Sequence, residues 1–192
     1  MSSPSFTSTH PPIGSAMTPE AYGEGKAAAL AWARENGFKD DMLVEIALQW
    51  GDQDSNAHVN NVVYFRWLET GRLNFMRALT TSLPESVARD LHGSGKGKGV
   101  ILARITYDYR LPAFYPDYVL IMHRPVQYSS RKMVFETAIY SYAQKTILGK
   151  GEAVMVGYDY DAQRSTNFPP EVLQELEQRG ARKVERGVGA KL

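Results

Sequence analysis

The chain has 192 residues, 43% of them hydrophobic, which is enough for one folded domain with extensions. Lysine and arginine (22) nearly balance aspartate and glutamate (21), and the net charge of +1 gives no reason to expect nucleic acid or an anionic membrane as a partner. The absence of cysteine excludes disulfides, thiolate metal sites and cysteine nucleophiles. No apolar run approaches the roughly 18 residues of a membrane span.

The first part of the chain predicts a tail followed by an added helix. Residues 1–17 are rich in Ser, Thr and Pro, with neither an apolar core nor any Lys or Arg, which argues against secretory and mitochondrial signals and predicts a disordered tail. A cytoplasmic location is therefore expected, with the mitochondrial matrix as the alternative. Thr18-Pro19-Glu20 predicts a helix start, and the helix is expected to run to about Asn36. Residues 18–42 form an N-terminal helical extension to which we assign no chemistry.

Residues 43–182 are predicted to form the main domain. A first strand is expected over residues 43–50 and a long, largely buried helix over residues 61–79, where apolar residues recur every three or four positions. Gly71 in the middle of that helix indicates the close approach of a strand. Residues 80–99 are expected to be a polar connection, and their glycine-rich end lacks the spacing of a phosphate-binding P-loop.

The second half of the domain alternates with a period of two. Strands are predicted over residues 101–111, 118–128, 133–143 and 146–160, with a bulge or sheet edge at Pro125, then a short helix over residues 169–182 and a flexible tail over residues 183–192. This order predicts an α+β fold in which an antiparallel five-stranded sheet wraps around one central helix. Pairing with a second copy would cover an edge of such a sheet, so a homodimer or a tetramer of dimers is expected.

The polar stretch of residues 50–61 runs directly into the long helix. Its two aspartates, Asp52 and Asp54, precede a helix N-terminus whose free N–H groups near Asn61 favour negative charge, and Asp54 is the candidate catalytic carboxylate for the resemblance given below. A carboxylate beside a carbonyl whose oxygen faces such N–H groups is the minimum apparatus for acyl transfer. The plain alternative for Asp54 is a loop or capping role.

The loop and the helix together resemble a known signature. Asp52-x-Asp54-x-x-x-His58-Val59-Asn60-Asn61-x-x-Tyr64, followed by Arg66-Trp67-x-Glu69-x-x-Arg72, resembles that of hotdog-fold acyl-CoA thioesterases of the 4-hydroxybenzoyl-CoA thioesterase type. The resemblance covers residues 43 to about 180. It implies a hotdog fold, subunit-interface active sites and hydrolysis of acyl-CoA, with no metal and no cofactor beyond the coenzyme A of the substrate. It places the essential aspartate at Asp54 and the carbonyl-polarising amide at Asn61.

The remaining loop residues carry alternatives. Asp52 in an extended segment would share a side with Asp54 and raise the pKa of one carboxyl; otherwise it forms a turn. His58 is a candidate for catalysis or for orienting the loop. Asn60 and Tyr64 are predicted to bind substrate, although Asn60 is also a good helix cap.

The contacts to coenzyme A are predicted at a hairpin. Ser130, Arg131 and Lys132 occupy a reversal that in related proteins often approaches the nucleotide, and Lys96 and Lys98 are second candidates for its phosphates. The alternative is a solvated pair of hairpin charges.

Two further sets of residues complete the prediction. Some hotdog thioesterases use a helix glutamate as the catalytic carboxylate, but Glu69 at its spacing is expected instead to form an ion pair with Arg72. Aromatic surface for an acyl pocket is expected from Tyr107, Tyr109, Phe114, Tyr140 and Tyr142.

Hydrolysis of acyl-CoA thioesters is thus the leading prediction for function. The alternatives are a non-catalytic acyl-CoA-binding module and a thioesterase acting on acyl carrier protein. A hotdog hydratase fits the pattern from Asp54 to Asn61 poorly.

Overall fold

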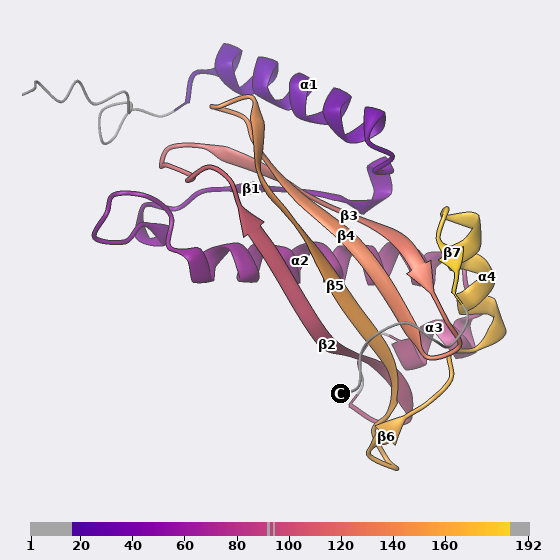
Figure 1. Ribbon diagram of the computed structural model, residues 1–192. Coiled ribbons are helices and arrows are strands. Elements are labelled where there is room, and N and C mark those ends of the chain that lie inside the picture. The colour runs from indigo at the N-terminus through magenta and orange to yellow at the C-terminus, as the bar shows by residue number, and fades with distance from the viewer. Residues whose placement is uncertain (1–16, 92, 94, 185–192) are drawn as a thin grey trace, which may run out of the picture.

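The computed structural model describes residues 17–91, 93 and 95–184 (Figure 1), so the two predicted tails lie almost entirely outside the described residues. The helices are α1 (Pro19–Glu35), α2 (Asn61–Thr81), α3 (Glu85–Leu91) and α4 (Pro170–Gln178). The strands are β1 (Leu43–Ala47), β2 (Lys98–Tyr109), β3 (Tyr118–Tyr128), β4 (Lys132–Ser141), β5 (Thr146–Asp159), β6 (Arg164–Ser165) and β7 (Arg182–Lys183).

The sheet has the order β1-β3-β4-β5-β2, with antiparallel neighbours throughout. Two short strands extend it: β6 pairs with β5, and β7 runs parallel to β3. Figure 1 shows α2 lying along one face of this sheet and α1 over the other. The predicted α+β hotdog fold, with an added N-terminal helix, is therefore confirmed. No helix among the described residues is both long enough and apolar enough to cross a membrane.

The helix α1 forms where its capping residues predict. The Thr18 hydroxyl accepts a hydrogen bond from the Ala21 N–H at 3.2 Å, and Pro19 occupies the first turn, where its missing N–H costs nothing. The buried residues Ala29 and Ala33 pack with Met122 and Ala138 on the face of the sheet opposite α2. Small side chains let the helix approach this face closely.

The central helix α2 fills the concave face of the sheet. Its buried side chains contribute to two apolar clusters, one around Leu68 near its N-terminus and one around Phe75 near its C-terminus. A Cβ atom at Gly71 would lie 2.6 Å from the His123 ring of β3, and Ile121 is nearly as close. The predicted close approach of a strand at Gly71 is thus confirmed.

Two differences from the sequence prediction have local causes. The predicted polar connection contains α3, a helix of seven residues whose Leu91 is buried in the cluster around Phe75. A helix this short depends on tertiary packing, so periodicity does not reveal it.

The strand β1 ends at Ala47, because Trp50–Asp52 forms a turn of 3-10 helix. The expected bulge at Pro125 is present as a register shift between β3 and β4.

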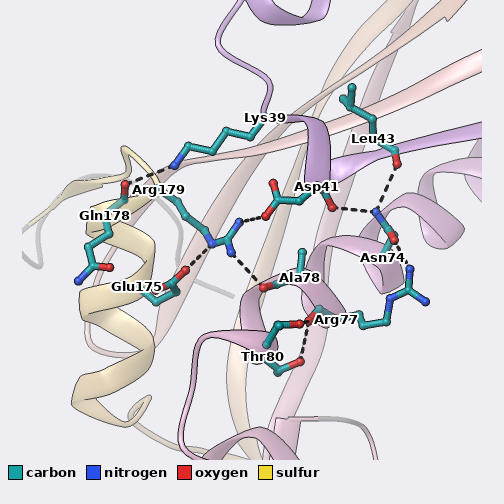
Figure 2. Close-up of polar contacts among 11 residues, drawn as sticks. Lys39, Asp41, Leu43, Asn74, Arg77, Ala78, Thr80, Glu175, Gln178 and Arg179 are labelled. Atoms are coloured by element: carbon teal, nitrogen blue, oxygen red, sulfur yellow. Dashed lines mark hydrogen bonds and ion pairs between the residues drawn. The ribbon is translucent and has the colours of Figure 1, made fainter. Parts of the chain in front are cut away.

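An arginine in the C-terminal segment ties α4 to the rest of the domain (Figure 2). The Arg179 guanidinium donates to the Glu175 carboxylate at 2.7 Å, to Asp41 at 2.9 Å and to the Ala78 carbonyl oxygen at 3.0 Å. Its side chain is only 8% exposed. These bonds hold α4 over the end of the core to which Val172 and Leu176 contribute.

Candidate active site

The loop before α2 is a closed turn built by its own backbone. Gln53 and Val59 form an isolated antiparallel bridge, and the Asp54 N–H donates to the His58 carbonyl oxygen at 2.9 Å. The Ala57 N–H donates to the Asp54 carbonyl oxygen at 3.1 Å, and Ala57 has a φ of 58°, in the left-handed region. This turn fixes the direction in which the Asp54 and His58 side chains leave the backbone.

The two carboxylate oxygens of Asp54 have different neighbours. Oδ1 accepts a hydrogen bond from the Asn56 N–H at 2.8 Å, and Oδ2 lies 3.5 Å from His58 Nδ1. The Asp54 side chain is 22% exposed. One oxygen is therefore held by the loop, while the other remains available for chemistry.

Asp52 forms a turn, the second of the two roles predicted for it. Its carboxylate accepts a hydrogen bond from the Gln49 N–H at 2.9 Å, and its carbonyl oxygen accepts one from the Asn60 N–H at 2.9 Å. Both bonds hold the entry and the exit of the loop together. Asp52 thus supports the loop that carries Asp54.

The N-terminus of α2 is capped by Asn60. Its side-chain oxygen accepts a hydrogen bond from the Val62 N–H at 3.0 Å, as a helix cap does. Asn61 is the first residue of the helix, so its N–H has no acceptor within the helix. The positive end of the helix dipole therefore lies at Asn60 and Asn61, where a backbone N–H can donate to an oxyanion.

The opposite wall of the site comes from the end of β2 and the segment after it. The Tyr109 hydroxyl donates to the Asn61 carbonyl oxygen at 3.0 Å, and the Ala113 N–H donates to the Tyr64 hydroxyl at 2.9 Å. The Val59 N–H donates to the Ala113 carbonyl oxygen at 2.8 Å. These three bonds fasten the loop and the first turns of α2 to residues about fifty positions later.

Between these walls lies a pocket of about 350 Å³. It brings together four predicted site residues, namely Asp54, His58, Asn61 and Tyr64, with residues from the opposite wall, namely Tyr109, Arg110, Leu111 and Pro112. Burial raises the pKa of Tyr64 to about 12, so its hydroxyl stays protonated at neutral pH. Sequence reasoning missed Arg110, Leu111 and Pro112, because only the topology reveals that this segment faces the loop.

The predicted coenzyme A contacts lie at the other end of the sheet. Ser130, Arg131 and Lys132 form the β3–β4 hairpin, whereas the active-site loop lies near the start of β3 (Figure 1). Eleven residues of β3 separate the two ends, about 36 Å at 3.3 Å per residue. Arg131 instead lines a second pocket, of about 840 Å³, together with Lys98 and Arg164. Within one chain, the hairpin and Asp54 are not brought together.

Two of the five expected acyl-pocket aromatics lie on the wrong face of the sheet. Tyr107 and Tyr109 are on the side of α2, but Tyr140 and Tyr142 pack in the cluster beneath α1. The Tyr142 hydroxyl donates to the Glu45 carboxylate at 2.8 Å and helps to hold α1, since Glu45 also accepts from Tyr22. The prediction was wrong because alternation separates the two faces of a strand without showing which one faces the site.

The expected ion pair on α2 is also not formed. No hydrogen bond or ion pair joins Glu69 to Arg72 in the part of the chain that the structure describes, and Arg72 Nη1 is buried without a partner. Glu69 is exposed, whereas Arg72 points into the domain.

A family model called the thioesterase-like superfamily matches residues 48–176, which include the loop, α2 and the sheet. The chain belongs to this superfamily. The finer assignment to the 4-hydroxybenzoyl-CoA type stays a prediction. A search of curated protein sequences finds no match.

Solved structures of low sequence identity share the fold. The PA2801 protein of Pseudomonas aeruginosa is 23% identical, with a TM-score of 0.59, and the match covers 69% of this chain and 95% of that one. A DHNA-CoA thioesterase from Staphylococcus aureus is 15% identical, with a TM-score of 0.59 and coverage of 71% and 88%. A 1,4-dihydroxy-2-naphthoyl-CoA thioesterase from Synechocystis is 13% identical, with a TM-score of 0.57 and coverage of 70% and 93%.

Proposed function

We propose that the protein hydrolyses acyl-CoA thioesters at the pocket beside the N-terminus of α2. The observation that carries the proposal is that Asp54 and Asn61 line one pocket and that Asn61 is the first residue of α2, whose backbone N–H has no acceptor within the helix. Membership of the thioesterase-like superfamily and the two acyl-CoA thioesterases among the similar structures support it.

In the proposed reaction, Asp54 acts on the thioester carbonyl or on a water molecule. As a general base it takes a proton from water, whose oxygen bonds to the carbonyl carbon; as a nucleophile it bonds to that carbon itself and gives a mixed anhydride that water then hydrolyses. In both routes the Asn61 N–H stabilises the oxyanion, the C–S bond breaks and coenzyme A leaves as the thiolate. Neither route uses a metal or a resident cofactor.

The proposed substrate extends from the loop to a neighbouring subunit. The pocket of Lys98, Arg131 and Arg164 has three cations against the one carboxylate of Asp159. This excess of positive charge suits the phosphates of coenzyme A, but the pocket lies at the far end of β2 from Tyr109. If two copies of β2 pair antiparallel, the Lys98 end of one strand meets the Tyr109 end of the other. We therefore propose a homodimer whose coenzyme A site is completed by the partner.

The test is thiol release from a panel of aliphatic and aromatic acyl-CoAs. Asp54→Asn should lower kcat by about 10²–10⁴-fold with little change in KM, because the variant keeps the shape of the pocket and loses the reactive oxygen. Glu35→Gln makes the same carboxylate-to-amide change at an exposed position of α1, over the other face of the sheet (Figure 1), and is the matched control that should keep full activity. Full turnover by Asp54→Asn, or no turnover of any acyl-CoA by the wild-type protein, would contradict the proposal.

A further inference from the structure

A row of polar side chains crosses the concave face of the sheet, under α2. The register pairs His123 of β3 with Thr137 of β4, Thr137 with Gly151 of β5, and Gly151 with Tyr107 of β2, so all four positions point to the same side. Within the described residues, both ring nitrogens of His123, the Thr137 hydroxyl and the Tyr107 hydroxyl are buried without a hydrogen-bond partner. His123 and Thr137 have no exposed surface at all.

The helix adds a cation to this row. Gly71 of α2 lies directly against the His123 ring, and the next residue, Arg72, carries the buried Nη1, which has no hydrogen-bond partner among the described residues. Burial, with help from the positive charge of Arg72, lowers the pKa of His123 to about 3. At neutral pH the histidine is therefore uncharged, and Arg72 supplies the positive charge of the row.

The row lies next to the candidate active site. The Tyr107 ring is 5.8 Å from that of Tyr64 and 5.0 Å from that of Tyr109, and both of these line the pocket that contains Asp54. The hydroxyl of Tyr107 lies 2.8 Å from where a Cβ atom of Gly149 would be, and Gly149 pairs with Tyr109, so the hydroxyl reaches over β5 on the side of the row that is nearer the pocket. Among the described residues no hydrogen bond holds that hydroxyl, and the inference requires that a change in the Tyr107 rotamer opens the row to the pocket.

The hydrogen-bond donors of the row indicate which kind of ligand group it would bind. An N–H of Arg72, the hydroxyls of Thr137 and Tyr107 and the one N–H of the neutral His123 ring can all donate, and buried donors of this kind are normally paired. A guanidinium favours a carboxylate above other acceptors. We propose that the row binds a carboxylate at the distal end of the acyl group, so that the preferred substrates are coenzyme A thioesters of dicarboxylic acids. This inference rests on the proposed thioesterase function and names the substrate class of the same site.

The experiment compares ligands that differ only at the distal end. The Asp54→Asn protein is titrated by calorimetry with matched acyl-CoA pairs of increasing length, such as succinyl with butyryl and adipoyl with hexanoyl. In at least one pair, the carboxylated ligand should bind more tightly. In that pair, adding Thr137→Val or Tyr107→Phe should weaken binding of the carboxylated acyl-CoA about tenfold or more. The affinity for the uncarboxylated acyl-CoA of the pair should not change.

The control change is Tyr140→Phe, which removes the same hydroxyl from a tyrosine on the opposite face of the sheet. It should alter neither ligand's affinity. A melting curve of the unliganded Thr137→Val protein gives a second readout. An unpaired buried hydroxyl predicts an unchanged or higher Tm for this variant, whereas a hydroxyl bound to ordered water predicts a lower one.

The competing explanation is a layer of ordered water with no part in recognition. The inference is overturned if no carboxylated acyl-CoA binds more tightly than the uncarboxylated one of its pair. It is also overturned if Thr137→Val lowers the Tm and leaves the ratio of the two affinities unchanged. These outcomes differ from a failure of the proposed function. Absence of turnover in the wild-type protein would refute hydrolysis, while binding to Asp54→Asn would still test the row.

Discussion

Of the two asparagines at the start of α2, one acts through its side chain and the other is proposed to act through its backbone. Asn60 uses its side chain to cap the helix, whereas Asn61, which lines the pocket, has the backbone N–H that we propose as the oxyanion donor. Changing the two neighbouring asparagines should therefore give different results.

Asn60→Ala removes the cap and should lower the free energy of unfolding by about 1 kcal/mol. It should also lower kcat, because the helix N-terminus that carries the oxyanion donor is loosened. Asn61→Ala keeps the N–H and should change both quantities little. Urea unfolding and thiol release measure the two effects, and a larger loss of activity in Asn61→Ala would show that its side chain takes part in the reaction.

His123 gives a prediction about acid stability. Its folded pKa of about 3 lies below the unfolded value of about 6.5, so between these pH values only the unfolded chain binds the proton. The stability contributed by the neutral imidazole is complete above pH of about 6.5 and falls as the pH drops, by about 1.4 kcal/mol per pH unit. Because other groups titrate in the same range, the measured quantity is the difference between wild type and His123→Gln. That difference should change with this slope between pH of roughly 6 and 4, and a flat difference would contradict the prediction.

At the scale of secondary-structure elements, Gly71 marks the closest contact between α2 and the sheet. Gly71→Ala places a Cβ 2.6 Å from the His123 ring and should destabilise the protein by about 1–3 kcal/mol, despite the better helix propensity of alanine. The control is Gly23→Ala in α1, where nothing lies within 4 Å, and propensity alone predicts a gain of up to about 1 kcal/mol. Equal effects at both positions in thermal unfolding would show that the helix and the strand adjust at no cost.

The elements differ in how well local sequence predicts them. The strand β3 has the predicted bounds because its alternation and flanking turns are local signals, and α2 is defined by a long apolar period and an asparagine cap. The short helix α3 was missed because only packing against the core makes it favourable.

The same limit applies to the candidate site. The loop and the helix N-terminus are adjacent in the sequence, so Asp54, His58 and Asn61 could be predicted together. Tyr109 was expected in an acyl pocket, but Arg110, Leu111 and Pro112 of the same wall were not, because their place opposite the loop depends on the order of strands in the sheet. The polar row under α2 depends on strand register, which a single sequence does not specify.

At the scale of the whole molecule, β2 is an uncovered edge. Twelve residues long, it pairs on one side with β5 and ends the sheet on the other, among the described residues. Ile101 on this strand is 39% exposed. A long edge with exposed apolar residues promotes pairing with another chain. Antiparallel pairing of two β2 strands would also bring the Lys98 end of one copy beside the Tyr109 end of the other.

Ile101→Lys should therefore separate the proposed dimer, because it places a charge of the same sign on both copies of the shared edge. Light scattering after size-exclusion chromatography should give a dimer mass for the wild-type protein and a monomer mass for the variant. Thiol release by the variant should show a raised KM for acyl-CoA, since the partner's cationic pocket is lost. Leu73→Lys, at a position of α2 that is 68% exposed, is the control and should remain dimeric. Dissociation by Leu73→Lys alone would place the interface on the helix instead. The coenzyme A phosphates would then need donors near Asp54 within the same chain, and Arg110, which lines the pocket, is a candidate.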